Sequence, residues 1–370
     1  MAAPNIPLSK RTGRRINQFP PTLISNTMRM LQDLCSEMNF AKNPVHVLSK
    51  QGGKSNIVVF TCVLLASQER IRCVLRTSRY YNLSESCEDP IDDTSVQLTV
   101  VVTRMLKLRY GLPVPNIWAY DTRYENSIKC PYVIEEEVAG MTLWNYNRMM
   151  RQSLPHRMPT QRDTGRFAWR YVFAKRIAEF IAEKDKVQLP CYCASIDTSN
   201  MPRYVFNKHD DRYTSAKDSV ASRSLFYRHD ILVCIESFAH ARTLRSYPDE
   251  KEKVATLKDM CSIMRKNIVL KDQPSVLWHA DFNPRKIMFE SDATGLFLTR
   301  VIDWDKAIAL PRLMTREPPS FLWKDDSLML PEWVSNGIKQ TFDDTIERLV
   351  PGYKEDAYST AAVLVRMLSG

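Results

Sequence analysis

Two acidic motifs near the end of the chain constrain its fold and chemistry more than any other feature. His279 and Asp281 follow directly after the apolar run 276–278, and Asp303 follows directly after the apolar run 301–302. Short apolar runs bounded by polar residues are typical of buried strands, so both carboxylates are expected at strand ends. In that position one carboxylate can orient a hydroxyl group while the other holds Mg²⁺. The spacing therefore favours a phosphoryl-transfer site.

The residues of these motifs resemble the aminoglycoside phosphotransferase family, most closely its fungal branch. The family's catalytic loop reads roughly His-Gly-Asp-x-x-x-x-Asn, and its metal motif reads Ile-Asp-Trp/Phe-Glu/Asp. Here the His, both Asp and the Trp are present, and segment 317–323 resembles a Pro-Pro-aromatic segment of fungal members. The resemblance covers about residues 45–335. It implies an α+β, bilobal protein-kinase-like fold, with a small antiparallel-sheet N-lobe that has one main helix and a larger, mainly helical C-lobe.

The same resemblance implies a role for each residue of the motifs. Asp281 is expected to be the catalytic base or hydroxyl-orienting group, and Asp303 the Mg²⁺ ligand. His279 is expected to support the loop by hydrogen bonding rather than to take a proton itself. Asp305 either caps a following segment or assists at the metal. The implied cofactors are ATP and Mg²⁺, and the implied acceptor is a hydroxyl group of a small molecule that the sequence does not identify.

One departure from the family pattern bears directly on catalysis. The family's second metal ligand is an Asn five positions after the catalytic Asp, and the residue there is Lys286. An ammonium group has donors and no lone pair, so it cannot ligate Mg²⁺. It can instead lie against a phosphate oxygen and supply some of the charge that a second metal would give. Lys286 is thus either a compensating catalytic residue or a sign of lost catalysis.

A glycine-bearing turn before a strand matches the family's nucleotide-binding turn. Glycine lacks a Cβ atom, so backbone amides there can approach triphosphate oxygens. The residues expected at the phosphates are Gly52, Gly53, Ser55 and Asn56. Without the other motifs, two glycines in this position would indicate only a tight turn.

Arg76 stands where kinases have the strand lysine that contacts the α- and β-phosphates. Arginine keeps the charge and binds phosphate well; the alternative is an ordinary exposed strand residue. The helix glutamate that would pair with this cation falls near Thr99, which cannot form the ion pair. Gln97, Asp92 or Asp93 are the possible substitutes.

Residues 132–140 match the family's hinge. Backbone N–H and C=O groups from Glu136 to Val138 are expected to hydrogen-bond the adenine edge. Because those groups belong to the backbone, side-chain identity is uninformative there. The alternative is simply the last strand of a sheet and its turn.

The chain divides by composition into a basic, Pro-containing tail (1–25), a nucleotide-binding N-lobe (26–140) and a C-lobe with the catalytic loop and acceptor site (141–370). Within the C-lobe, residues 195–230 are polar and aperiodic, which is typical of an inserted surface segment. Periodicity predicts a hairpin, further strands and helices. The predicted strands are 56–66, 71–77, 117–120 and 132–137, and the predicted helices are 95–108, one around Phe173 to Ile181, 225–244, 252–269 and 358–368.

Composition narrows the class of protein. Hydrophobic content of 44% and charged content of 25% are ordinary for globular domains. The longest apolar run, 57–66, is too short to span a bilayer, and no secretory signal is apparent at the N-terminus. Nine cysteines without framework spacing suit a reducing compartment, so a cytoplasmic protein without a membrane span is expected. Cys191 and Cys193 have no second Cys/His pair at zinc spacing and do not predict a metal site.

Three functions are compatible with these features. The first is an ATP-dependent phosphotransferase that moves the γ-phosphoryl group to a small-molecule hydroxyl. The second is an impaired relative that binds nucleotide or a partner without turnover, as Arg76, Thr99 and Lys286 would suggest. The third is a nucleic-acid-binding module, since the net charge is +10. The basic residues are dispersed and not interleaved with aromatic ones, so no specific nucleic-acid partner is expected.

Overall fold

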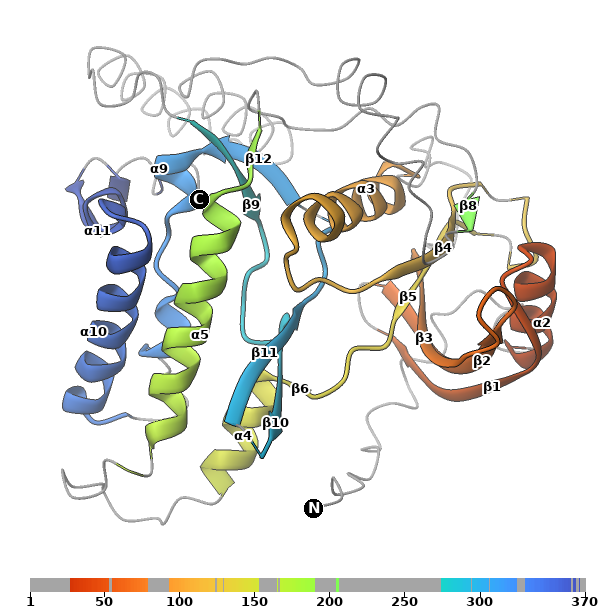
Figure 1. Cartoon of the computed structure of the whole chain (residues 1–370), viewed down its shortest axis with the longest axis horizontal. Coiled ribbons are helices and arrows are strands. Elements are labelled where there is room, and N and C mark those ends of the chain that lie inside the picture. The colour runs from red at the N-terminus through yellow and green to blue at the C-terminus, as the bar shows by residue number, and fades with distance from the viewer. Residues whose placement is uncertain are drawn as a thin grey trace, which may run out of the picture. The chain divides into compact units, whose positions relative to one another are not determined.

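The computed structural model of the chain divides into two compact units (Figure 1). It describes residues 27–52, 55–78, 93–123, 125–128, 130–152, 165, 167–189, 204–205, 274–293, 295–305, 307–324, 330–360, 362–363 and 366. The first unit comprises Met1–Lys107, Pro115–Val138 and Thr198–Val220, and the second comprises Leu108–Val114, Ala139–Asp197 and Ala221–Gly370.

A six-stranded sheet forms the centre of the first unit, with strand order β1-β2-β3-β5-β4-β8. All its pairs are antiparallel. Its strands are β1 (Ala41–Gly52), β2 (Ser55–Leu64), β3 (Arg70–Ser78), β4 (Ile117–Asp121), β5 (Tyr132–Glu136) and β8 (Tyr204–Val205). Strands β2 and β3 form the hairpin that the sequence predicts, with Val59 opposite Val74.

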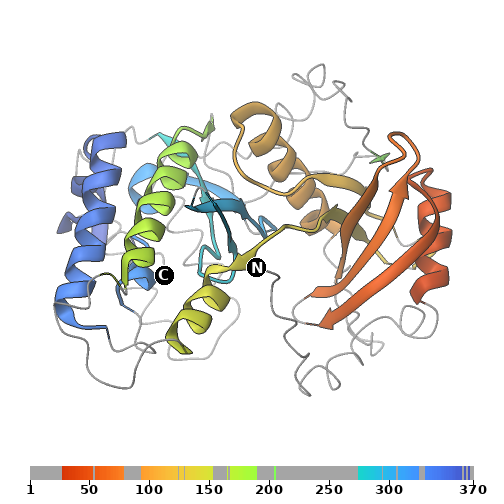
Figure 2. The same cartoon turned by 60° about the horizontal axis from the view of Figure 1, so that its bottom comes forward.

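Helix α2 (Thr27–Glu37) covers the strands at one end of this sheet (Figure 2). It buries Met30, Leu31, Leu34 and Cys35 in one core with residues such as Phe60. The apolar side chains recur at helical spacing, so burying this face is what holds a short helix together. Helix α3 (Asp93–Tyr110) contributes Val96 and Val100 to a second cluster.

The second unit contains two three-stranded antiparallel sheets. One has the order β11-β10-β6 and the other β12-β9-β7. Their strands are β6 (Met141–Thr142), β7 (Gln188–Leu189), β9 (Ser275–His279), β10 (Ile287–Asp292), β11 (Gly295–Val301) and β12 (Ala307–Pro311). Gly140, with φ 90°, precedes β6, and a Cβ there would lie 2.1 Å from the carbonyl oxygen of Phe289. Glycine is therefore required for the chain to approach β10 this closely.

Two long helices of the second unit, α5 (Ala168–Asp185) and α10 (Glu332–Leu349), lie side by side (Figure 1). Phe173, Ile177, Phe180 and Ile181 of α5 are all buried, as their spacing predicts. The remaining described helices of this unit are α4 (Leu143–Gln152), α9 (Arg312–Thr315), the 3₁₀ helix η6 (Ser320–Leu322) and α11 (Tyr353–Tyr358).

The observed elements confirm the predicted α+β class, with a small antiparallel sheet in the first unit and long helices in the second. The helix predicted at 95–108 and the strands predicted at 117–120 and 132–137 are present as α3, β4 and β5. Helix α2 and strand β1 were not predicted, so the expectation of one main helix in the first unit omitted α2. Residues 204–205, in the segment expected to be a surface insertion, add β8 to the sheet beside β4.

Several predictions fall outside the described residues. These are the tail 1–25, the helices 225–244 and 252–269, most of segment 195–230, Gly53, Asp92, Cys191, Cys193, the side chains of Ser55, Asn56, Asp93 and Gln97, and much of the helix expected at 358–368.

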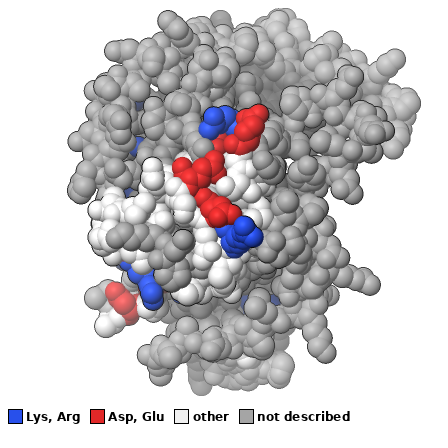
Figure 3. Space-filling view, turned by 90° about the vertical axis from the view of Figure 1, so that its right-hand side faces the viewer, with Lys and Arg blue, Asp and Glu red and all other residues white. Residues whose placement is uncertain are grey.

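On the face drawn in Figure 3, the described acidic and basic side chains lie near one another, and the described residues form no basic patch there. Within the part of the chain that the structure describes, no helix has both the length and the apolar character needed to cross a bilayer.

Candidate active site

Strand ends of the second unit bring the two acidic motifs together. Strand β9 ends at His279, and β10 begins at Ile287, which pairs with Val301 at the end of β11. Beyond that pair, the Ile302 N–H donates to the Lys286 carbonyl at 2.9 Å. The residue before β10 and the residues after β11 are therefore neighbours because of the strand register.

His279 connects the loop after β9 to the segment after β11. Its Nε2 lies 3.0 Å from the Ile302 carbonyl, and its Nδ1 accepts from the Asp281 N–H at 3.2 Å. A carbonyl oxygen only accepts, so Nε2 carries the proton. Burial lowers the pKa of His279 to about 4, which leaves the ring neutral at pH 7. Its ring packs 4.6 Å from the ring of the buried Trp304.

The Asp281 carboxylate is hydrogen-bonded by a neighbouring side chain and remains open to solvent. Its side chain is 49% exposed. Asn283 donates from Nδ2 to Oδ1 of Asp281 at 2.6 Å, and its own Oδ1 accepts from the Arg285 N–H at 2.9 Å. Asn283 thus orients the carboxylate, a role that the sequence analysis did not assign. The sequence does contain a sign of this role, because the side chain of an Asn two positions after an Asp can hydrogen-bond back to it in a tight turn.

Asp303 has a backbone conformation that is unusual for its residue type. Its φ is 74°, in the left-handed region, which non-glycine residues adopt rarely and often at functional sites. The next residue is anchored, since Trp304 is buried and donates from Nε1 to the Val301 carbonyl at 2.9 Å. The chain turns sharply between a strand end and a fixed aromatic ring, and the Asp303 carboxylate stays partly exposed at 18%.

Lys286 lies between the two carboxylates. Its ammonium group hydrogen-bonds Oδ2 of Asp303 and lies 3.7 Å from Oδ2 of Asp281. All four residues expected at the catalytic centre, namely His279, Asp281, Lys286 and Asp303, therefore gather at one place in the second unit. The positive charge of Lys286 partly offsets the negative charges of these two carboxylates.

The donor set fits one Mg²⁺ ion better than two. Mg²⁺ is commonly held by one or two carboxylates together with substrate phosphates and water. Asp303 can serve in that way, although it shares its carboxylate with Lys286. A second ion does not fit beside it, because the Lys286 ammonium lies next to both carboxylates and has no lone pair. Among the described residues, no group of three or more His, Cys, Asp and Glu side chains could hold a metal.

The residues expected at the nucleotide belong to the first unit. Gly52 is the last residue of β1 and pairs with Asn56 of β2. Ser55, the first residue of β2, pairs with Ser78.

Arg76 has a different partner from those the sequence suggested. On β3, its Nη1 lies 3.6 Å from Oε1 of Glu135 on β5, and both side chains are largely buried. Arg76 opposes Val133 in the sheet, so Glu135 is a diagonal neighbour two residues along the paired strand. Thr99, where the family would have the helix glutamate, is buried. The ion pair is thus made across the sheet.

The proposed hinge retains few amides for a ligand. The Glu136 N–H donates to the Asn116 carbonyl at 2.8 Å, and the Glu137 N–H donates to the Arg72 carbonyl at 3.1 Å. The Glu136 side chain accepts two hydrogen bonds from Asn116. Any adenine contact from this segment would have to use the Val138 N–H or the carbonyl groups.

No protein-family model matches this sequence, and no curated protein sequence matches it. Among solved structures, it is similar to aminoglycoside phosphotransferase APH(4)-Ia, with 16% identity over 91% of this chain and 86% of that chain and a TM-score of 0.48. It is similar to aminoglycoside-3'-phosphotransferase of type VIII, with 12% identity over 89% of this chain and 93% of that chain and a TM-score of 0.46. It is also similar to Plasmodium vivax ethanolamine kinase, with 11% identity over 88% of this chain and 80% of that chain and a TM-score of 0.41.

The fungal branch expected from the sequence finds no support in these comparisons. The similar solved structures are small-molecule phosphotransferases. Similarity at this level does not establish a family, a substrate or an activity for the chain.

Proposed function

We propose that the chain is an ATP-dependent phosphotransferase that acts on a hydroxyl group of a small molecule. The observation that carries the proposal is the arrangement around Lys286. Two carboxylates, Asp281 after β9 and Asp303 after β11, flank one ammonium group, and a neutral histidine connects the two segments that carry them. The exposed Asp281 carboxylate is the group that can meet an acceptor.

In the proposed reaction the acceptor hydroxyl donates a hydrogen bond to Asp281. The bond between the γ-phosphorus and the bridging oxygen of ATP breaks, a bond from the acceptor oxygen to that phosphorus forms, and the acceptor proton passes to Asp281. His279 keeps the loop in place and, being neutral, adds no charge of its own. Lys286 places a positive charge beside the reacting phosphoryl group. Mg²⁺ bound at Asp303 would neutralise further phosphate charge.

On the nucleotide side, the proposal assigns phosphate contacts to Gly52, Gly53, Ser55, Asn56 and Arg76. Arg76 would keep its position through Glu135, which is 3.6 Å away and performs the pairing expected of a helix glutamate. The adenine would be bound by backbone groups between Glu136 and Val138.

A second candidate function is nucleotide or partner binding without turnover. The hydrogen bond between the Lys286 ammonium and Asp303 favours it, because a fixed positive charge on that carboxylate competes with a metal ion. The two functions make different predictions for substitutions of Lys286, so they can be separated.

The first experiment is a screen of the purified chain for Mg²⁺-dependent ATP consumption with a library of hydroxyl-bearing metabolites. Asp281→Asn should abolish turnover and leave ATP binding nearly intact, while Asp303→Ala should also weaken metal-dependent nucleotide binding. The matched control is Asp344→Asn, which removes an exposed carboxylate on α10 and should change neither turnover nor nucleotide binding. Equal ATP loss with wild type and Asp281→Asn would refute the assignment of the base.

The second experiment compares Lys286→Ala and Lys286→Asn over a range of Mg²⁺ concentrations. If Lys286 is a compensating group, Lys286→Ala should lower the rate by roughly tenfold to a thousandfold, the scale of one transition-state electrostatic contact. If it is a lesion, the wild type should be nearly inactive and Lys286→Asn should gain activity, because a ligand for a second ion is restored. That gain would replace the first function with the second.

A further inference from the structure

A cavity of the second unit lies beside the loop that carries Asp281, and its volume is about 140 Å³. Helix α5, the end of β9, the segment after α9 and helix α11 all contribute to its walls. The lining residues are Phe180, Ile181, Lys184, Trp278, His279, Ala280, Phe282, Thr315, Glu317, Pro318, Pro319, Ser320, Phe321 and Tyr353. Asp281 is not among them, although Ala280 and Phe282 on either side of it are.

Lys184 brings a buried positive charge to this cavity. The residue is only 6% exposed. Among the described residues, its ammonium group has one recorded hydrogen bond, to the Leu277 carbonyl at 3.1 Å. An ammonium has three donors, so this bond leaves capacity for an acceptor in the cavity. Burying such a group without a bonded anion is unfavourable.

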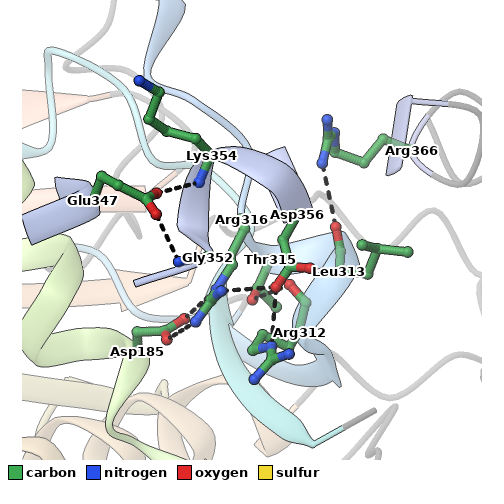
Figure 4. Close-up of polar contacts among 10 residues, drawn as sticks. All are labelled: Asp185, Arg312, Leu313, Thr315, Arg316, Glu347, Gly352, Lys354, Asp356 and Arg366. Carbon is green, nitrogen blue, oxygen red and sulfur yellow. Dashed lines mark hydrogen bonds and ion pairs between the residues drawn. The ribbon is translucent and has the colours of Figure 1, made fainter. Parts of the chain in front are cut away.

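Asp185, the residue after Lys184, makes its hydrogen bonds to another cation. Arg316 donates to both oxygens of Asp185, at 3.3 and 2.6 Å, and to Asp356 at 2.7 Å (Figure 4). Arg312 also lies 3.2 Å from Asp356. Both carboxylate oxygens of Asp185 therefore accept from Arg316, and neither accepts from Lys184.

Tyr353 adds a second buried polar group to this cavity. Its ring is 1% exposed and lies under the Arg316 guanidinium at 5.3 Å. Its hydroxyl has no hydrogen-bond partner among the described residues. A buried hydroxyl left unpaired is unusual in a folded protein and indicates a missing partner.

Thr315, Glu317 and Ser320 are further polar residues of the wall, and its aromatic and proline side chains form an apolar part that suits an apolar ligand body. The rings of Phe180 and Phe282 are stacked with centroids 5.8 Å apart, and Phe321 lies 6.0 Å from Phe282. Pro318 and Pro319 continue this surface. The cavity volume is close to that of an engineered cavity of about 150 Å³ that binds benzene.

From these groups we propose that the cavity binds a small monocarboxylate with a compact apolar body, whose carboxylate accepts hydrogen bonds from Lys184 and Tyr353. Isovalerate and benzoate are suitable probes. Burial lowers the pKa of Lys184 to about 8, so the group is largely protonated at pH 7. Because His279, Ala280 and Phe282 line the cavity, its ligand would also restrain the loop that holds Asp281.

Titration calorimetry of the full chain at pH 7 tests this proposal. Isovalerate and benzoate are expected to bind, and their neutral amides are expected to bind at least tenfold more weakly. Lys184→Met keeps the apolar stem and removes the charge, so it should weaken carboxylate binding roughly tenfold to a hundredfold. Tyr353→Phe should weaken it by a smaller factor. Lys186→Met is the matched control, because Lys186 is exposed just after the same helix and pairs with Glu183.

Three outcomes would overturn the proposal. They are equal binding of acid and amide, unchanged affinity in Lys184→Met, and no binding of either acid at millimolar concentration. Circular dichroism of each variant checks that it is folded. Asp281→Asn should bind the carboxylates like wild type, so the outcome here is independent of whether the chain is a phosphotransferase.

Discussion

Replacing Arg316 with Met should destabilise the second unit through the charges it leaves behind. Arg316 is 4% exposed and donates to Asp185 and Asp356, on α5 and α11 (Figure 4). Removing one partner from a buried ion pair typically costs about 3–5 kcal/mol. Asp356 keeps Arg312 at 3.2 Å, whereas Asp185 loses both hydrogen bonds. We therefore expect a loss of about 3 kcal/mol, near the lower end of that range.

Urea unfolding followed by tryptophan fluorescence measures this loss. Of the seven tryptophans, only Trp118 belongs to the first unit, so the signal reports mainly on the second. Arg176→Met on α5, the helix that carries Asp185, is the control. Arg176 forms an exposed ion pair with Glu179 at 2.9 Å, so its loss should change the free energy of unfolding by less than about 1 kcal/mol.

The double variant Asp185→Asn with Arg316→Met sharpens the test. It should recover much of the stability, because the unpaired buried charge is removed. If Arg316→Met were no more destabilising than the Arg176 control, the reasoning that a buried unpaired carboxylate dominates would be refuted.

Three further predictions concern stability, each measured by urea unfolding. Gly140→Ala should cost more than about 2 kcal/mol, because φ is 90° and the new Cβ would meet the Phe289 carbonyl; Gly352→Ala, with φ 81° and open space, should cost about 1 kcal/mol. The pKa of Lys184 falls from 10.5 to about 8 through burial, so the folded state binds fewer protons and stability should rise between pH 8 and 10.5. The rise should total about 3 kcal/mol and vanish in Lys184→Met. The pKa of His279 falls from 6.5 to about 4, also through burial, so stability should decrease as the pH falls from 6.5 to 4, and this loss should be absent in His279→Gln.

Much of the local structure was predictable because it depends on neighbours in sequence. The hairpin β2–β3 and helices α3 and α5 follow from alternating or helical apolar spacing, and each is present. Strand β1 was missed because residues 42–44, Lys-Asn-Pro, interrupt its pattern, and its pairing with β2 shifts register near them. A strand of this kind is stabilised by its partner more than by its own composition.

Helix α2 was missed for a related reason. It has eleven residues and would be marginal alone. Its stability comes from burying Leu31 and Leu34 against the sheet, and the strands that supply this surface come later in the chain.

By itself, the sequence determined the local part of the candidate site. An apolar run followed by His279 and Asp281, and another followed by Asp303, predict carboxylates at strand ends, because strand formation and the turn after it are local. Only the tertiary structure decided what surrounds them. Lys286 lies between the carboxylates because Ile287 pairs with Val301. Lys184 and Tyr353 line one cavity although they are far apart in the chain. Pairing register and desolvation arise only when distant segments pack together, so no local pattern encodes them.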